Sequence, residues 1–490
     1  MKKAGIIGAG VGGIATAIRL ALKGYQVTVF EAADTFGGKM KQFDLEGFRF
    51  DTGPSLFTLP HLVDDLFRAA GRQPAAYFCY QRLEVITHYF FADGTRLPAY
   101  AEPERFAAAV EQQLGVPRHQ VLQYLRQSGQ LYEATAPTFL RKSLHKPATY
   151  LSADLLKTLR VLPRLGLTAT MHQANSRAFA DARLVQLFDR FATYNGSDPY
   201  QAPATLNLIP HLEHNLGAFY PEGGMHAIAA SLVQLAEELG VVFHYREPVQ
   251  QILSQGDKVT GLQTAKNRYA LDVVVSNMDI IPTYRQLLPQ LKAPETTLRQ
   301  PRSSSALIYY WGIRQSFPDL HLHNIFFSRD YQQEFHHIFQ AGNIGPDPTV
   351  YVNITSKYTP ADAPPGMENW FVLVNVPHNT GQDWPQLVNN TRDAVLEKIS
   401  GLLQTDIRPL IACERVWDPV GIESETSSFG GALYGSSSNN PMAAFLRHPN
   451  FTSQLQNLYF CGGSVHPGGG IPLFLLSASI VATLVPAGDQ

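Results

Sequence analysis

Three glycines near the N-terminus have the spacing of a phosphate-binding turn. Gly8, Gly10 and Gly13 fit the pattern G-x-G-x-x-G and lie between two short apolar runs. In this pattern the first glycine permits a tight turn, the second lets a pyrophosphate approach the backbone, and the third lets a helix pack closely on a sheet. The N–H groups at the start of that helix bind phosphate oxygens. Together with Val11 and Gly12, these residues predict the pyrophosphate site of a dinucleotide.

The segments around these glycines have the pattern of a βαβ unit. Residues 4–7 and 27–30 are apolar runs that predict strands, and the residues between them carry apolar side chains at helical spacing. Glu31 follows the second run directly, where a carboxylate can accept hydrogen bonds from a ribose diol. Strand, glycines, helix, strand and acid therefore occur in the order that a dinucleotide-binding domain requires.

Two further glycine turns indicate which dinucleotide is bound. Gly37-Gly38-Lys39 follows Glu31 at short range, and Asp51-Thr52-Gly53-Pro54-Ser55 comes soon after it. A glycine pair followed by a basic residue is typical of the two-dinucleotide-binding-domain flavoproteins, and this resemblance implies FAD as the cofactor. It places Lys39 near the pyrophosphate and the second turn near the flavin. The residues assigned to FAD here are Gly38, Lys39, Met40, Gly53, Pro54 and Ser55.

A second glycine-rich helix start lies near the C-terminus. Residues 458–460 predict a strand, Gly462 and Gly463 a turn, and the run from Ile471 onward an apolar helix with Pro472 in its first turn. Reduction of a flavin places negative charge on one edge of its ring, which the positive end of a helix dipole stabilises. We therefore assign Gly463, Ile471 and Pro472 to the flavin site.

The chain between these ends divides into alternating segments. The predicted FAD-binding parts are residues 1–75, 216–285 and 426–490, and the predicted substrate domain comprises residues 76–215 and 286–425. In the returning segment, Val249 matches the position whose backbone contacts adenine in such flavoproteins. Asn277 and Met278 follow a buried strand and complete the predicted cofactor site.

Composition limits the possible partners. The 490 residues carry a net charge of −2, which lacks the basic excess of a nucleic-acid binder. The three cysteines, Cys79, Cys413 and Cys461, have no metal-ligand spacing, and their small number suits a reducing compartment. Because the cysteines lack this spacing, we expect no metal site. No run of about 20 apolar residues predicts a membrane-spanning helix. These features predict a cytoplasmic protein.

Taken together, these motifs resemble the bacterial-type phytoene desaturase family of carotenoid desaturases and isomerases. The resemblance covers nearly the whole chain and includes the Tyr220–Met225 segment. Its most specific block, residues 462–473, is most similar to the branch of 1-hydroxycarotenoid 3,4-desaturases, because Ser464 and Leu473 depart from the phytoene desaturases themselves. The resemblance implies an α/β fold with a Rossmann-like FAD domain, a mixed α+β substrate domain and a helical lobe that faces the membrane.

The family resemblance also implies an activity and its partners. We expect an FAD-dependent oxidoreductase that removes a hydride from an allylic carbon of a carotenoid, with quinone or oxygen as the electron acceptor. The substrate must come from lipid, so we expect peripheral attachment to a membrane surface. Between Pro137 and Arg177 lie seven basic residues and one acid, and Leu151, Leu155, Leu159 and Leu162 recur there at helical spacing. This composition predicts an interfacial helix.

No strong catalytic base stands out in the sequence. Glu222 and His466 are the catalytic candidates by their position in the flavin motifs, with Tyr220 a weaker one. Two alternatives stay open at this point: a carotenoid isomerase of the same fold, and a prenyl- or lipid-binding protein on a flavoprotein-like scaffold. An amine oxidase is less favoured, because the C-terminal motif gives no support for an aromatic cage.

Overall fold

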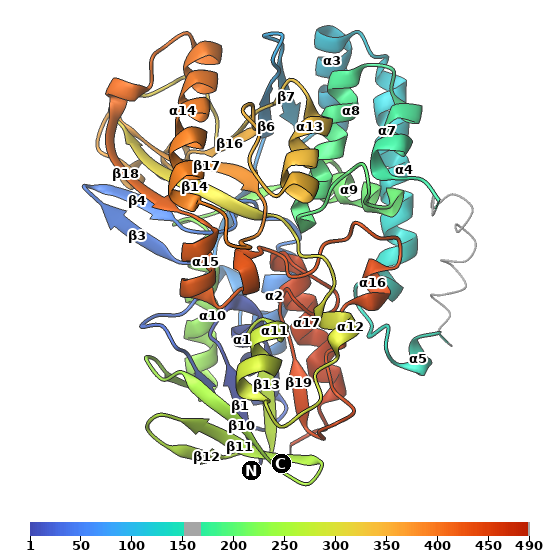
Figure 1. The fold of residues 1–490 in the computed structure, drawn as a ribbon, viewed down its shortest axis with the longest axis vertical. Helices are drawn as coiled ribbons and strands as arrows, with labels where there is room; N and C mark the ends of the chain where they lie inside the picture. Colours follow the sequence, from blue (N-terminus) through green and yellow to red (C-terminus); the bar gives the residue numbers. More distant parts are fainter. Residues whose placement is uncertain (151–167, 489–490) are drawn as a thin grey trace.

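The structure, a computed structural model, describes residues 1–150 and 168–488. Figure 1 shows two parts stacked along the long axis, with both described ends of the chain side by side at the bottom of the lower part. A parallel sheet lies in the lower part. The upper part holds a large mixed sheet on one side and a group of helices on the other.

A five-stranded parallel sheet forms the centre of the lower part, with the strand order β19-β13-β1-β2-β9. The chain contributes these strands from three separate stretches. Their bounds are β1 Lys3–Ile7, β2 Gln26–Phe30, β9 Val242–His244, β13 Val273–Ser276 and β19 Leu458–Phe460. The structure thus confirms the predicted strands at 4–7, 27–30 and 458–460.

Four helices cover one face of this sheet. The first, α1 (Val11–Leu22), packs against both α10 (His226–Glu238) and α17 (Ile471–Leu484), and α2 (His61–Ala69) completes the layer. Small residues such as Ala15, Ala17 and Ala478 are fully buried in it. The N-terminal and C-terminal helices therefore share one core, although more than 400 residues separate them in the sequence.

Smaller sheets extend the lower part and connect it to the upper one. A three-stranded antiparallel sheet contains β10 Val249–Gln255, β11 Lys258–Thr264 and β12 Arg268–Ala270. Two antiparallel pairs are formed by β3 Gln42–Leu45 with β4 Phe48–Asp51, and by β5 Tyr80–Arg82 with β8 Phe219–Pro221.

The upper part is built on a seven-stranded mixed sheet with the order β18-β14-β17-β16-β15-β6-β7. Only the β15–β6 pair is parallel in this sheet. The bounds are β6 Val85–Phe90, β7 Arg96–Tyr100, β14 Ser305–Ile313, β15 His323–Phe326, β16 Val350–Asn353, β17 Glu368–Val376 and β18 Ile411–Trp417.

Side chains alternate between the two faces of this sheet, as in any strand. On one face Tyr309, Val352 and Val372 form a core with α14 (Trp384–Leu403). On the other face, Ile308, Tyr351 and Phe371 line a cavity. The sheet therefore serves as a wall between its own core and the cavity.

Helices flank the sheet beside its β6–β7 edge (Figure 1). They share a core that includes Phe106, Phe188 and Phe191. Their bounds are α3 Pro103–Leu114, α4 Arg118–Phe139, α7 Met171–Ala178, α8 Ala182–Asp189 and α9 Ile209–His214. The predicted interfacial helix, with Leu151, Leu155, Leu159 and Leu162, lies outside the described residues.

Short helices complete the described chain. They are α5 Pro147–Tyr150, α11 Ile280–Pro282, α12 Glu295–Leu298, α13 Tyr331–His336, α15 Pro419–Thr426 and α16 Ala443–Leu446. Among the helices within 1–150 and 168–488, none is long and apolar enough to span a bilayer.

Asp51 connects the β3–β4 pair to the start of α10. Its buried carboxylate accepts hydrogen bonds from the backbone N–H groups of Met225 (2.9 Å) and His226 (3.1 Å), and it forms an ion pair with Arg49 (2.8 Å). The carboxylate thus satisfies two donors that the first turn of a helix leaves unpaired. Asp51 acts as a helix cap supplied from a distant part of the sequence.

Replacing Asp51 by alanine should therefore destabilise the protein. We expect Asp51→Ala to lower the free energy of unfolding by about 2–3 kcal/mol, because it removes a cap and leaves buried N–H groups unpaired. Urea titration followed by circular dichroism measures this change. Asp44→Ala, at an exposed position of the same strand pair, serves as the control and should change stability by less than about 0.5 kcal/mol. Equal stability of the two variants would contradict the capping role.

Candidate functional site

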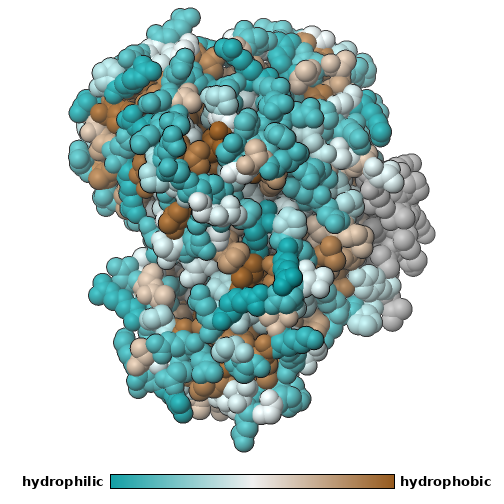
Figure 2. Space-filling model, viewed as in Figure 1, coloured by the Kyte–Doolittle hydropathy of each residue, from teal (hydrophilic) through white to brown (hydrophobic). Residues whose placement is uncertain are grey.

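A cavity of about 1090 Å³ lies between the two parts of the molecule. Figure 2 shows that the molecule narrows at the level where these parts meet. The cavity wall includes both glycine-rich turns, the segments after β2 and β4, and one face of the seven-stranded sheet. Segments from both ends and from the middle of the chain therefore enclose one space.

Asn277 lies where the two glycine-rich turns meet. Its backbone N–H donates to the carbonyl of Ile7 (2.8 Å), and its side-chain amide donates to the carbonyl of Cys461 (3.3 Å). A Cβ added at Gly10, Gly12 or Gly462 would come within 2.9 Å of that amide. Glycine at these positions is required by the close packing around Asn277. The structure thus brings residues 8–13 and 462–463 together at one point.

The turn between β1 and α1 has no room for other side chains. Gly8 has φ +93°, a conformation that favours glycine, and its N–H donates to the carbonyl of Phe30 (2.8 Å). A Cβ on Gly13 would collide with the carbonyl oxygen of Gly8. Gly10, Val11 and Gly12 line the cavity at the start of α1. The positive end of this helix therefore faces the cavity.

Glu31 stands at the end of β2, in the cavity wall. Its carboxylate accepts hydrogen bonds from the N–H groups of Ala9 (2.6 Å) and Ala33 (2.8 Å). A carboxylate has about four lone-pair sites, so two remain for hydroxyl groups of a ligand. Val249 lines the same cavity from β10.

The turn with Gly37 and Gly38 packs directly on the first glycine loop. The N–H of Gly37 donates to the carbonyl of Ala9 (2.8 Å), and a Cβ on Gly38 would lie 3.3 Å from the Cα of Gly10. The buried Met40 follows, and its carbonyl accepts a hydrogen bond from His226 (2.9 Å). These contacts fix the path of the chain along the edge of the cavity.

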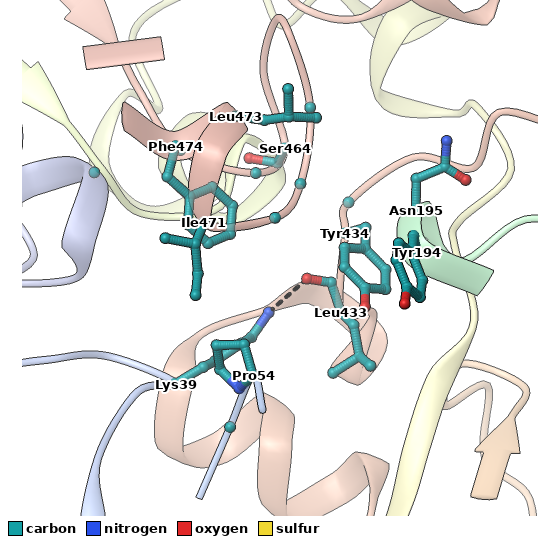
Figure 3. A pocket seen from close by; sticks show the side chains of 18 of the residues that line it. Lys39, Pro54, Tyr194, Asn195, Leu433, Tyr434, Ser464, Ile471, Leu473 and Phe474 are labelled. Atoms are coloured by element: carbon teal, nitrogen blue, oxygen red, sulfur yellow. Dashed lines mark hydrogen bonds between the residues drawn. The ribbon is translucent and has the colours of Figure 1, made fainter. Parts of the chain in front are cut away.

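Lys39 places a cation in the cavity wall. Its ammonium group donates to the carbonyls of Leu433 (3.1 Å) and Ala432 (3.3 Å), as Figure 3 shows for Leu433. Desolvation lowers the pKa of Lys39 to about 8, although the nearby Asp279 opposes this shift. Lys39 therefore loses its proton more readily than a lysine in water.

The turn after β4 and the start of α17 face this cation. A Cβ on Gly53 would collide with the carbonyl of Lys39, and Pro54 lies beside the Lys39 side chain (Figure 3). Ser55 forms a hydrogen bond with the hydroxyl of Tyr351 (2.7 Å). The other predicted residues in the cavity lining are Met278, Gly463, Ile471 and Pro472. All the cofactor residues predicted from sequence thus lie in or next to one site.

The three catalytic candidates are placed elsewhere. Glu222 is exposed at the turn after β8, and the cavity lining formed by the described chain does not include it. His466 is buried, and its Nε2 donates to the carbonyl of Lys142 (2.9 Å). Burial lowers the pKa of His466 to about 4, so the ring is neutral. The hydroxyl of the buried Tyr220 bonds to Thr359 (3.0 Å). The cavity lining formed by the described chain thus includes none of these three side chains, and their catalytic role stays a prediction.

Several lining residues have no signal in the sequence. Tyr194 and Asn195 lie beside Tyr434 in Figure 3, across the cavity from Lys39. His323 and Tyr351 project from the seven-stranded sheet. None of them belongs to a cofactor motif, and the alternation of side chains along β15 and β16 only indicates on which face of the sheet His323 and Tyr351 lie. In the described ranges, no group of three or more His, Cys, Asp or Glu side chains could hold a metal ion.

Comparison with known proteins identifies the family. Residues 11–486 match the sequence profile of the family described as flavin containing amine oxidoreductase. The chain is 52% identical to a 1-hydroxycarotenoid 3,4-desaturase of a Flavobacterium species, over 99% of each chain. It is 34% identical to a 4,4'-diapolycopene oxygenase of a Methylomonas species, over 99% of this chain and 98% of that protein.

Solved structures share the fold. An oxidoreductase from Methanosarcina mazei superposes with a TM-score of 0.65 at 14% identity, over 98% of this chain and 99% of that chain. The glycine turns, the free lone pairs of Glu31 and the helix starts at the cavity fit an FAD molecule. The chain therefore belongs to the FAD-dependent, flavin-containing amine oxidoreductase family, within the group that includes these carotenoid desaturases and oxygenases.

Proposed function

We propose that the protein is an FAD-dependent desaturase of carotenoids that carry a 1-hydroxy end group. One observation carries this proposal: the dinucleotide-binding turns and a largely apolar chamber form a single cavity. A relative with 52% identity over 99% of the chain is named a 1-hydroxycarotenoid 3,4-desaturase. A polyene needs an apolar chamber, and its oxidation needs a two-electron acceptor next to that chamber.

We assign the cofactor contacts residue by residue. The pyrophosphate binds the N–H groups of residues 10–13 at the start of α1, and Glu31 accepts hydrogen bonds from the ribose diol. The backbone of Val249 contacts adenine. Gly8, Gly38 and Lys39 lie next to the pyrophosphate. The flavin end is held by the remaining residues of the site, namely Met40, Gly53, Pro54, Ser55, Asn277, Met278, Gly463, Ile471 and Pro472. In this proposal residues 1–75, 216–285 and 426–490 form the FAD-binding domain.

When bound, FAD supplies a two-electron oxidant that can accept a hydride from a carbon next to a polyene. Desaturation also requires loss of a proton from the adjacent carbon. The polyene itself stabilises the positive charge, so the protein needs mainly to orient the substrate and exclude water. The sheet wall, with Ile308, Phe371 and Leu373, supplies an apolar surface for this purpose. We propose quinone or oxygen as the acceptor that finally takes the electrons.

The cavity also reaches an apolar surface beside α16. Phe139 and Phe445 line it and have ring centroids 5.6 Å apart, and Met442 continues the wall. Met442 and Leu446 have exposed fractions of 53% and 40%. The segment before α5 lies alongside, because His145 Nε2 bonds to the carbonyl of Phe445 (3.3 Å). The same segment carries the exposed basic residues Arg141 and Lys146.

These features support a peripheral membrane contact at α16. Exposed apolar side chains next to basic ones are the composition of a surface that binds anionic lipid. A carotenoid could then pass from the bilayer into the cavity without crossing water. The helical, membrane-facing lobe expected from the family resemblance is part of this proposal.

The mass of the product tests the proposed reaction. We expect purified holoenzyme, given an acyclic 1-hydroxycarotenoid and an electron acceptor, to form a product that is two hydrogens lighter. Chromatography coupled to mass spectrometry measures this change, and heat-inactivated protein is the control. A product of unchanged mass would identify an isomerase instead.

Gly12 tests the proposed cofactor site. A Cβ there would lie 2.9 Å from the Asn277 amide and 3.5 Å from the Cα of Gly462. We expect Gly12→Val to weaken FAD binding by roughly 10-fold or more, since it wedges the two turns apart and blocks the phosphate. The flavin absorbance of the purified protein measures occupancy. Gly401→Val, with open space around it on α14, should keep full occupancy. Full occupancy in both variants would exclude this site.

Met442 and Leu446 test the proposed membrane contact. We expect the double variant Met442→Asp/Leu446→Asp to bind vesicles with anionic lipid roughly 10-fold more weakly, because two exposed apolar side chains that would enter the bilayer are replaced by charges. Co-sedimentation with the vesicles measures binding. The matched control is Val416→Asp/Val420→Asp, at two other exposed apolar positions. Equal losses in both double variants would count against α16 as the contact.

A further inference from the structure

Polar side chains gather on one side of the otherwise largely apolar chamber. They come from the neighbouring strands β6, β15 and β16 and from the segments next to them, whereas β14 and β17 contribute mainly apolar side chains. All but one of these polar residues are buried, and Tyr351 is half-buried. The group consists of Thr87, Arg190, His323, Tyr331, Thr349 and Tyr351.

His323 is held in one tautomer by its neighbours. The Asn353 amide nitrogen donates to the carbonyl of Leu322 (3.0 Å), which fixes the orientation of that amide. The same amide nitrogen lies 3.2 Å from Nδ1 of His323, and the hydroxyl of Tyr351 lies 2.7 Å from Nδ1. Because an amide nitrogen can only donate, Nδ1 must accept. The proton of a neutral His323 therefore sits on Nε2.

The resulting Nε2–H group is a buried donor without a partner in the described chain. His323 is 2% exposed and lines the cavity, and its Nε2 makes no hydrogen bond to any described residue. The Nε atom of Arg190, on the same wall, is also without a partner there. Burial, together with the nearby Arg190 charge, lowers the pKa of His323 to about 3, so the ring stays neutral. A buried donor left unpaired is costly, which favours a ligand that brings an oxygen.

The position of this donor relative to the flavin site suits a hydroxyl near the reacting carbons. Ser55 lies in the turn assigned to the flavin, its hydroxyl contacts Tyr351 at 2.7 Å, and Tyr351 contacts His323 at 2.7 Å. In a 1-hydroxy end group the oxygen is three bonds from C3, one of the two carbons that a 3,4-desaturation joins by a double bond. The group that binds this oxygen must therefore lie close to the flavin.

We propose that His323 Nε2–H donates a hydrogen bond to the oxygen of the substrate's 1-hydroxyl group and so selects hydroxylated carotenoids. This inference rests on the proposed function and names the residue that sets its substrate class. Tyr351 and Asn353 are positioning residues, since they hold the His323 ring and its tautomer. A site built to bond a hydroxyl rejects the analogue that lacks it, because the donor is then left unpaired.

Two ligands test the proposal on the wild-type holoenzyme. One is an acyclic carotenoid with a 1-hydroxy end group, and the other is the same carotenoid with hydrogen in place of the hydroxyl. Quenching of protein fluorescence gives both dissociation constants. We expect the hydroxylated ligand to bind roughly 10-fold or more tightly. A ratio near one would overturn the proposal, whatever the behaviour of any variant.

Variants of His323 test whether this residue causes the preference for the hydroxylated ligand. We expect His323→Phe to reduce the ratio to near one with FAD retained, and His323→Gln, which keeps a nearby N–H donor, to restore part of it. His323→Met replaces the Phe variant if that protein fails to fold, since Met fills irregular gaps. His321→Phe, two residues away and outside the cavity lining of the described chain, is the matched control and should keep the wild-type ratio.

The outcomes separate this inference from the proposed function. If His323→Phe keeps the wild-type ratio, or slows turnover of both ligands equally without changing the ratio, hydroxyl recognition by His323 is wrong. If the wild-type protein prefers the hydroxylated ligand and His323→Phe does not, yet no product two hydrogens lighter forms, recognition stands and desaturation fails.

Discussion

The close contact of two glycine-rich turns around Asn277 is the constraint on which the cavity depends. Its amide occupies the space that a side chain on Gly10, Gly12 or Gly462 would need. The two turns can therefore come together only if these positions are glycine. This contact sets the start of α1 against the start of α17 within one core. Two helix ends with positive dipoles thereby face the same space, which is the electrostatic requirement for binding a dinucleotide whose flavin becomes negative on reduction.

The rest of the cavity follows from the alternation of side chains in the seven-stranded sheet. One face forms a core with α14, and the other face lines the cavity. Low polarity in this chamber has consequences for the few polar groups within it. It lowers the pKa values of Lys39 and His323. It also raises the free-energy cost of each unpaired hydrogen-bonding group, which favours a ligand with a complementary donor or acceptor.

Local features of the cofactor site could be predicted from the sequence, and distant ones could not. The turns at Gly8–Gly13, Gly37–Gly38 and Gly462–Gly463 carry their own signal, because glycine is required where the backbone approaches itself. His323 and Tyr351 carry no such signal, since strand pairing between distant segments places them together. Glu222 and His466 lie close to flavin motifs in the sequence. In the structure, however, Glu222 is exposed and His466 forms a hydrogen bond with the carbonyl of Lys142, so neither side chain lines the cavity of the described chain.

The central claim is that both glycine-rich helix starts bind one flavin. A crystal structure of the holoenzyme tests it most directly. The account predicts one FAD per chain, with its pyrophosphate at the N–H groups of residues 10–13 and its ring between Ser55 and the start of α17. A flavin bound outside this cavity, or a ring far from residues 462–472, would contradict it.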